Sequence, residues 1–116
     1  MLKEDRIRLQ HVLDAAKEAV AFSQDKSRSD FAQDRKLLLS VVKCIEIIGE
    51  AAGSVTVAVT GKHPGIPWTA LKAMRNRLAH AYFDINTKTV WDTVSQDLPA
   101  LIRAVEGILA ERDLPG

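Results

Sequence analysis

The sequence predicts an all-α fold, an antiparallel bundle of four to five helices. Three observations point to it. Apolar residues recur every three or four positions in nearly every segment, most connectors are short, and no segment has a convincing partner strand. The chain has 116 residues, enough for a single modest core, so we expect residues 1–116 to form one helical domain.

The first helix is expected from about residue 2 to about residue 22. Its apolar residues have the spacing of one buried face: Leu9, Val12, Leu13, Ala16 and Val20. Residues 23–30 include no apolar side chain and are expected to be a polar connector. Ser29 or Asp30 can cap the next helix, because their side-chain oxygens accept the free amide hydrogens of its first turn.

The second predicted helix is the longest and runs from the mid-thirties to about residue 60. The apolar rhythm continues through Leu38, Val41, Val42, Ile45, Ile48, Ala52, Val55 and Val59. Residues 54–60 are β-branched and alternate in polarity, which also suits a strand, but the lack of a partner strand favours a helix. Gly53 would weaken this helix, so we expect a neighbouring element to pack closely there.

Two Gly and two Pro make residues 61–67 a clear break. The third helix is expected from about residue 67 to about residue 82, and Pro67 suits its first turn because a proline lacks the amide hydrogen that would be unpaired there.

Residues 83–86 form the next connector, and Asn86 or Thr87 can cap the last helical segment. Its apolar positions are Trp91, Val94, Leu98, Leu101, Val105 and Ile108. Pro99 predicts a kink or a restart of this helix, with Asp97 as the new cap. Residues 111–116 are expected to be a frayed tail.

Composition narrows the classes of function. Sixteen Lys and Arg against fifteen Asp and Glu give a net charge of +1, so binding of nucleic acid would require a local basic patch. Cys44 is the only cysteine, which excludes an intrachain disulfide and favours a reducing, cytoplasmic setting. Its apolar neighbours predict a packed small side chain rather than a nucleophile. We expect no signal peptide and no membrane helix, because charged residues interrupt every apolar stretch.

The third predicted helix contains the pattern Arg75-x4-His80-x-Tyr82, which combines groups suited to phosphate chemistry. His80 can take a proton from a ribose 2′-hydroxyl or, when protonated, give one to a leaving oxygen near neutral pH. Arg75 can form paired hydrogen bonds to phosphate oxygens, and Asn76 can orient the histidine or donate to phosphate. No cluster with metal-ligand spacing accompanies them, so a metal-free reaction is favoured and no cofactor is expected.

Helical geometry does not bring these groups together within one chain. Arg75 and His80 are separated by about 140° around an ideal helix, and Tyr82 is also rotated away from His80. The long arginine side chain can wrap toward the histidine, or a second chain can bring another copy near. The spacing favours a site that is completed at a dimer interface.

Several of these residues also have plain structural interpretations. An Arg/His pair on a helix is more often a surface feature than a catalytic one, and Tyr82 can be a partly buried core aromatic. Trp68 and Trp91 are expected to be core or interface anchors. The remaining histidines, His11 and His63, have no evident partner and are expected to face solvent. Two acidic residues in the apolar middle of the second helix, Glu46 and Glu50, either form a solvated stripe or orient Arg75 or Arg77.

Three stretches of the sequence together resemble the HepT-like family of the HEPN superfamily. They are Ile-Gly-Glu-Ala-Ala at 48–52, His-Pro-Gly-Ile-Pro-Trp at 63–68, and Met-Arg-Asn-Arg-Leu-Ala-His-Ala-Tyr at 74–82. The likeness extends through Val90-Trp91 and Leu-Pro-Ala-Leu at 98–101 and covers nearly the full chain. Its most specific part, Arg75-x4-His80-x-Tyr82, matches the family pattern without departure.

The resemblance implies the toxin of a toxin–antitoxin pair, partnered by a minimal nucleotidyltransferase (MNT) antitoxin. Such a toxin is a metal-independent endoribonuclease that cleaves tRNA or mRNA, and it forms a homodimer whose cleft contains the motif. Arg75 and His80 would then be catalytic and Asn76 supporting, while AMPylation of Tyr82 by the antitoxin would block the RNA cleft. The basic residues expected to contact the RNA backbone are Arg77, Arg6 and Arg8.

Two other functions are compatible with the sequence. The chain can be a non-catalytic subunit that binds a nucleotide or a nucleotidyltransferase partner, which the near-neutral net charge supports. It can also be a structural dimerisation module in which Arg75 and His80 have no chemical role.

Overall fold

A computed structural model describes residues 1–79 and 85–111, with the backbone alone at 76–79, and every regular element in these ranges is helical. The elements are α1 (Lys3–Phe22), α2 (Arg28–Gln33), α3 (Arg35–Gly53), α4 (Val57–Thr60), α5 (Trp68–Ala79), α6 (Thr87–Asp92), the π-helical segment η1 (Thr93–Asp97) and α7 (Leu98–Ala110). The prediction of an all-α helical bundle is confirmed.

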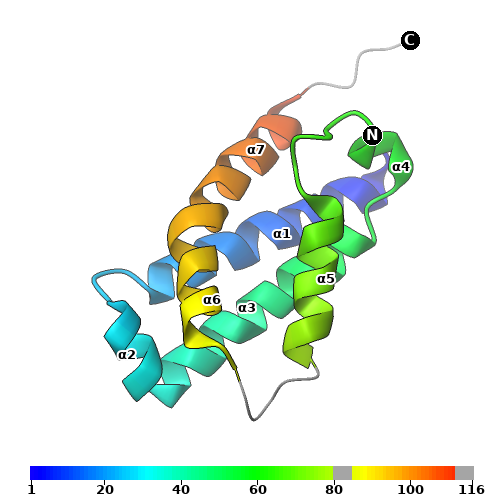
Figure 1. Ribbon diagram of the computed structural model, residues 1–116. Helices are drawn as coiled ribbons and strands as arrows, with labels where there is room; N and C mark the ends of the chain where they lie inside the picture. Colours follow the sequence, from blue (N-terminus) through cyan, green and yellow to red (C-terminus); the bar gives the residue numbers. More distant parts are fainter. Residues whose placement is uncertain (80–84, 112–116) are drawn as a thin grey trace.

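The two longest helices, α1 and α3, lie side by side at the centre of the bundle (Figure 1). Helix α5 packs on α3, and α7 packs on α1. Neighbours run antiparallel: Asp5 near the start of α1 meets Thr56 just beyond α3, and Arg6 meets Leu109 at the end of α7. The order α5, α3, α1, α7 follows, with α3 as the support for the candidate motif on α5.

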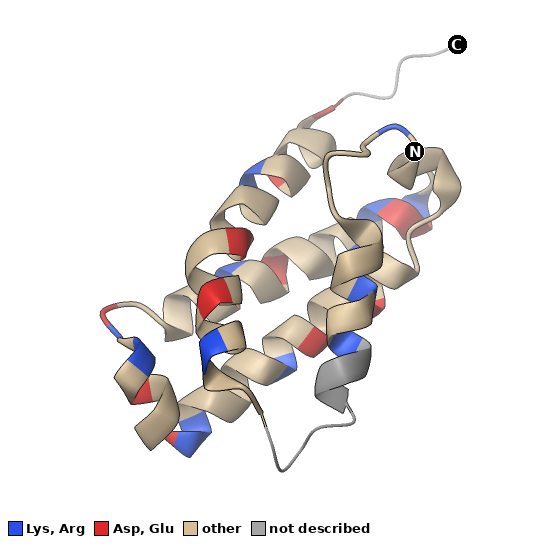
Figure 2. Cartoon of the chain, in the orientation of Figure 1, with Lys and Arg blue, Asp and Glu red and all other residues tan. Residues whose placement is uncertain are grey.

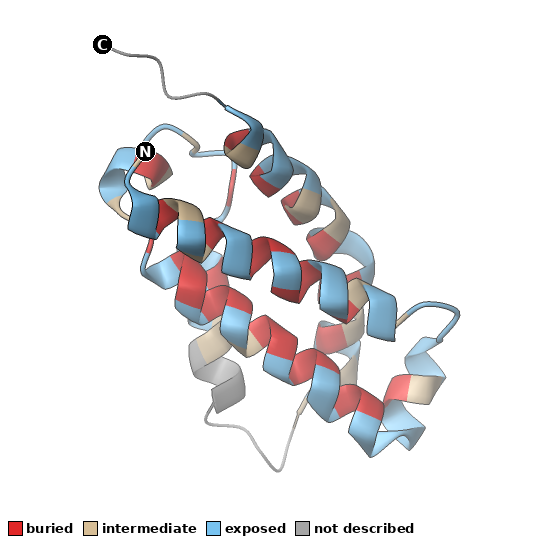
Figure 3. Cartoon of the chain, turned by 180° about the vertical axis from the view of Figure 1, so that it is seen from behind, coloured by how far each residue is buried: buried red, intermediate tan, exposed pale blue. Residues whose placement is uncertain are grey.

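The core consists of the apolar faces that the periodicity predicted. Viewed from behind, α1 and α3 show buried stripes that alternate with exposed positions (Figure 3). Leu9 and Val12 of α1 and Val41 of α3 have no exposed surface. Phe31 of α2 is also fully buried, with its ring edge-on to Trp91 at a centroid distance of 5.3 Å. The apolar rhythm of α1 and α3 thus identified the core correctly.

A short helix, α2, occupies part of the region predicted to be a connector. Its N-cap is Ser27: the Ser27 hydroxyl accepts the amide hydrogen of Asp30, whose carboxylate accepts the amide hydrogen of Ser27 at 2.7 Å. This reciprocal arrangement is a capping box, although with Asp in place of the usual Glu or Gln. The connector prediction was wrong for residues 28–30, because the capping box at Ser27 starts a helix at Arg28. The cap predicted for the long helix, Ser29 or Asp30, was wrong, because the side chain of Asp34 caps α3 by accepting the amide hydrogen of Leu37.

The long second helix was also predicted incorrectly, since it ends at Gly53 and α4 begins only at Val57. The break depends on Asp5, a fully buried carboxylate on α1. One oxygen of Asp5 accepts the amide hydrogen of Thr56 at 2.9 Å, and the other accepts its hydroxyl hydrogen at 2.5 Å. The backbone at Thr56 is extended, so this distant contact interrupts a pattern that otherwise favours helix.

The last helical segment accommodates Pro99 without a new N-cap. Residues Thr93–Asp97 form a π-helical stretch that runs directly into α7, where Pro99 lies in the first turn. Asp97 makes no side-chain cap hydrogen bond, so its predicted role as a cap was wrong. Asn86 does cap α6, because its side-chain oxygen accepts the amide hydrogen of Thr89 at 3.1 Å.

Within the described ranges, every helix is too short or too polar to cross a membrane.

Candidate functional site

The candidate motif begins on α5 at a point where this helix packs closely against α3. Gly49 of α3 faces Arg75 and the carbonyl oxygen of Leu71. A Cβ atom added at Gly49 would overlap the Cβ of Arg75 and would come within 2.7 Å of the Leu71 oxygen. Only glycine therefore allows the two backbones to approach this closely.

This contact fixes the position of Arg75 relative to α3. The Arg75 side chain starts against the α3 backbone and is half-buried. Sequence reasoning expected the close approach at Gly53 instead, but an added Cβ there would meet only the Lys72 side chain at 3.4 Å, an ordinary contact. Gly49 could have been found from the sequence, because it lies in the Ile-Gly-Glu stretch at 48–50 that belongs to the family resemblance.

The other motif residues lie wholly or partly outside the described structure. His80 and Tyr82 are outside the described residues, and so are the side chains of Asn76 and Arg77. Helix α5 continues to Ala79, which confirms that the pattern begins on a helix. The angular separation of Arg75 from His80 and Tyr82, and the roles of all five residues, stay predictions.

Two further residues predicted to contact RNA, Arg6 and Arg8, lie on α1 in different settings. The guanidinium of Arg6 donates to the carbonyl oxygen of Leu109 at 3.1 Å, so it joins α1 to the C-terminal end of α7. Cations are favoured at a helix C-terminus, where carbonyl groups lack partners. Arg6 therefore has a structural role, whereas Arg8 is half-buried and lines a surface hollow.

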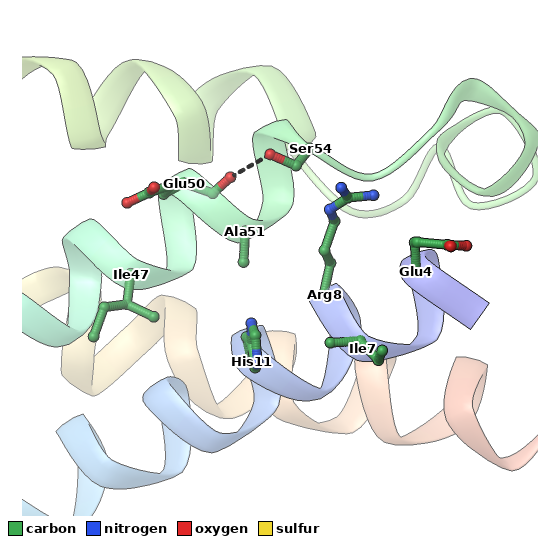
Figure 4. A pocket seen from close by; sticks show the side chains of 8 residues that line it. All are labelled: Glu4, Ile7, Arg8, His11, Ile47, Glu50, Ala51 and Ser54. Carbon is green, nitrogen blue, oxygen red and sulfur yellow. Dashed lines mark hydrogen bonds between the residues drawn. The ribbon is translucent and has the colours of Figure 1, made fainter. Parts of the chain in front are cut away.

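Arg8 and Glu50 lie around one shallow hollow between α1 and α3 (Figure 4). We call this surface the α1–α3 hollow; its volume is about 410 Å³. Its lining residues are Glu4, Ile7, Arg8, His11, Ile47, Glu50, Ala51 and Ser54. Sequence reasoning named Arg8 and Glu50 separately and did not relate them, because they are 42 positions apart in the chain.

The acidic pair of α3 divides between two environments. Glu46 is half-buried and lies 3.7 Å from the ammonium group of Lys43 on the same helix. Glu50 is exposed on the hollow, and its backbone oxygen accepts the hydroxyl hydrogen of Ser54 at 3.2 Å. The two carboxylates therefore do not act as a unit, and the orienting role of Glu50 stays a prediction.

The expectation that His63 faces solvent without a partner was wrong. Its side chain is 22% exposed, and its Nε2 lies 3.7 Å from a carboxylate oxygen of Glu111. Its backbone oxygen accepts the indole N–H of Trp68 at 3.0 Å, which ties the 61–67 loop to the start of α5. The half-buried Trp68 packs against the core, as predicted. His63 thus belongs to the frame that positions α5, while His11 is exposed as expected.

The charged side chains are not distributed as in a strongly basic nucleic-acid-binding protein. Acidic and basic residues are interleaved along the helices in Figure 2. Burial raises the pKa of the Cys44 thiol, which suits the packed residue that the sequence predicted rather than a nucleophile. The described ranges include no group of three or more His, Cys, Asp or Glu residues that could hold a metal ion.

An apolar groove of about 420 Å³ separates α5 from η1 and α7. Its walls include Leu71 and Met74 of α5 and Leu101 of α7. Thr93 joins the two sides, since its hydroxyl lies 3.8 Å from the Met74 sulfur. Helix α5 is therefore supported mainly by α3.

Comparison with known proteins agrees with the sequence resemblance. The family described as ribonuclease HepT-like matches residues 12–108. A protein of Methanocaldococcus jannaschii that has an RNase name is 32% identical over 98% of this chain and 93% of its own length. A Thermococcus cleftensis protein named as a ribonuclease HepT is 34% identical over 80% of this chain and 84% of its own.

A further relative with an RNase name, from Caldanaerobacter subterraneus, is 32% identical over 93% of this chain and 96% of its own length. No solved structure matches the chain significantly. The family match spans most of the sequence, including α3, α5 and the whole Arg75–Tyr82 pattern. The chain belongs to the ribonuclease HepT-like family.

Proposed function

We propose that this protein is a metal-independent endoribonuclease that cleaves tRNA or mRNA with Arg75 and His80. Membership of the ribonuclease HepT-like family supports the activity class. The observation that carries the assignment to the motif is the Gly49–Arg75 contact, which places the arginine at the crossing of α3 and α5. A catalytic group needs this kind of fixed support, because small errors in position reduce rates strongly.

The proposed reaction is an internal transfer within RNA. His80 takes the proton of the ribose 2′-hydroxyl, and the 2′-oxygen attacks the adjacent phosphorus. The bond from phosphorus to the 5′-oxygen breaks, and the protonated imidazole of His80 gives its proton to that oxygen. Arg75 stabilises the negative charge on the phosphate oxygens, with Asn76 in support. The products are a 2′,3′-cyclic phosphate and a free 5′-hydroxyl.

We further propose that the protein is the toxin of a toxin–antitoxin pair. It would act in the cytoplasm as a homodimer with the motif in a shared cleft. The MNT-type nucleotidyltransferase antitoxin would bind it and AMPylate Tyr82, which adds a bulky anion where RNA must enter. Arg77 is the best candidate for a contact with the RNA backbone, since Arg6 already binds the Leu109 carbonyl.

Cleavage by the purified full-length chain tests the catalytic proposal. Total RNA and a 5′-labelled oligonucleotide are incubated with wild type, Arg75→Ala or His80→Ala, in parallel reactions with EDTA and with Mg²⁺. We expect each variant to lose about 100-fold or more of the activity, since general acid–base groups contribute about 10²–10⁴-fold. The wild-type products should end in a 2′,3′-cyclic phosphate.

Arg103→Ala provides the matched control, because Arg103 is an exposed arginine on α7. It should cleave as fast as wild type. Equal cleavage by wild type and His80→Ala would refute the catalytic role of the motif, and loss of all activity in EDTA would refute a metal-free reaction. Antitoxin and ATP should add one AMP to wild type and none to Tyr82→Phe.

A non-catalytic binding subunit is the second candidate, favoured by the interleaved charges and the net charge of +1. In that case the chain would bind a nucleotide or the nucleotidyltransferase tightly and would leave RNA intact at every ratio of the two proteins. A cleavage assay across those ratios distinguishes the two functions.

A further inference from the structure

We propose that the α1–α3 hollow is the surface on which a second copy of this chain docks. In this arrangement a two-fold axis passes through the hollow, and Arg8 of each copy pairs with Glu50 of the other. The inference rests on the homodimer of the proposed function and identifies the face that forms it.

Apolar side chains occupy the centre of this surface. Ile7 of α1 is 46% exposed, and Ile47 of α3 is 37% exposed. They approach the hollow from opposite sides, with Ala51 between them on its floor (Figure 4). Charged residues surround them: Glu4 and Arg8 on α1, and Glu50 on α3. An apolar centre with a charged rim is the usual composition of a protein–protein interface.

The hollow carries charges of both signs. Arg8 lies on the α1 side, one turn from Glu4, and Glu50 lies on the α3 side. In Figure 4 the Glu50 carboxylate points away from the Arg8 guanidinium. Within the described ranges, no ion pair joins either side chain to another residue. Both groups therefore remain available to a partner.

Under two-fold symmetry, a surface with Arg8 on one side and Glu50 on the other can be complementary to a second copy of itself. In an isologous interface, residue i contacts residue j of the second copy and j contacts i. When the axis runs parallel to α1 and α3, the α1 side of one copy faces the α3 side of the other, and the Arg8–Glu50 pair forms twice. RNA suits the same surface less well, because Glu4 and Glu50 line it and would repel phosphates. The surface thus fits a second copy better than a nucleic acid.

This face also adjoins the candidate catalytic arginine. Arg75 packs over Gly49, and Glu50 is the next residue, about 100° further around α3. A copy docked on the hollow would therefore place both Arg75 residues at the margins of one interface. This is the arrangement that a cleft shared by two chains requires.

Charge reversal tests the interface directly. Light scattering and sedimentation are used to measure dimerisation of the full-length wild type, Arg8→Glu, Glu50→Arg and the double variant. Each single reversal should raise the dissociation constant by about tenfold or more, because symmetry repeats the repulsion twice and each pair contributes up to about 1 kcal/mol. The double variant should return to within about threefold of wild type, since it restores both pairs with exchanged signs.

Apolar variants give an independent readout. Ile47→Glu should dissociate the dimer, whereas Phe22→Glu should leave it unchanged. Phe22 is a suitable control because it is 41% exposed but lies at the other end of α1, away from the hollow. Circular dichroism establishes that each variant is folded before its dimerisation is compared.

A monomeric wild type at micromolar concentration would overturn the proposal, as would folded single reversals that dimerise normally or a double variant that does not recover. Weaker RNA binding by Arg8→Glu with an unchanged dimerisation constant would instead assign Arg8 to RNA. The cleavage test distinguishes failure of this proposal from failure of the proposed function. If His80→Ala loses activity and the charge reversals do not affect dimerisation, the ribonuclease function is supported and the α1–α3 hollow is rejected as the interface. If the reversals dissociate the dimer but the wild type cleaves no RNA, the interface is supported and the ribonuclease function is rejected.

Discussion

Replacing Gly49 by alanine should separate the packing cost at the α3–α5 crossing from the helical preference of alanine. The new Cβ would overlap the Arg75 Cβ and lie 2.7 Å from the Leu71 oxygen, whereas ordinary Cβ contacts begin at 3.4 Å. Helix α5 must therefore move outward by at least about 0.7 Å, the difference between these two distances, because the overlap with the Arg75 Cβ is closer still. Overpacking of this kind costs about 1–3 kcal/mol, and alanine recovers about 1 kcal/mol of helix propensity.

Gly107→Ala is the matched control for this change. Gly107 is exposed inside α7, and a Cβ added there would meet no atom within 4 Å. This variant should be stabilised by up to about 1 kcal/mol. The difference between the two variants cancels the propensity gain and isolates the packing cost, which we expect to be about 2 kcal/mol. In thermal unfolding at equal protein concentration, this corresponds to a difference in Tm of roughly 8 °C.

Cleavage kinetics provides the second readout. A displacement approaching 1 Å at Arg75 should reduce kcat/KM by about 100-fold in Gly49→Ala, while Gly107→Ala should match wild type. Equal stabilisation of both variants, with unchanged cleavage, would refute the argument that Gly49 positions Arg75.

Two further predictions concern the frame around the site. Asp5→Ala should lower the free energy of unfolding by about 2–3 kcal/mol in urea, because it leaves the amide and hydroxyl hydrogens of Thr56 without their carboxylate; a loss below about 0.5 kcal/mol would contradict this. The hydrogen bonds from the Ser27 backbone and then its hydroxyl lower the pKa of the Asp30 carboxyl. The stability that Asp30 contributes should therefore be present above its unfolded pKa and should be lost as the pH falls through its lower folded pKa. Ser27→Ala should weaken this acid dependence in urea unfolding between pH 2 and pH 6 (about the range of carboxyl titration), and an identical pH profile would count against it.

Periodicity predicted the core well because burial of an apolar face is a local property of a helix. Leu9 and Val12 on α1, and Val41 and Ile48 on α3, recur at helical spacing and are all buried. Local chemistry was also sufficient at Asn86, whose cap contact spans only three residues. These features depend on neighbours in sequence, so the sequence determines them.

The errors arose where a local sequence pattern was compatible with more than one backbone structure. The helix predicted to reach residue 60 ends at Gly53 because Asp5, 51 positions before Thr56, binds its backbone. The helical periodicity of apolar residues cannot reveal a contact between residues so far apart in the sequence. At Pro99, a π-helical turn relieves the constraint that was expected to require a cap at Asp97. Both outcomes depend on how the packed chain satisfies its backbone hydrogen bonds.

The candidate site shows the same division between sequence and structure. The sequence by itself determined the helical class, the apolar faces and the Arg75-x4-His80-x-Tyr82 pattern that accompanies membership of the ribonuclease HepT-like family. Only the tertiary structure showed that Gly49 lets α5 approach α3 at Arg75, and that Arg8 and Glu50 share one hollow. The physical reason is that spacing along a helix specifies which side chains share its face, whereas the register between two helices is decided by the small side chains at their crossing.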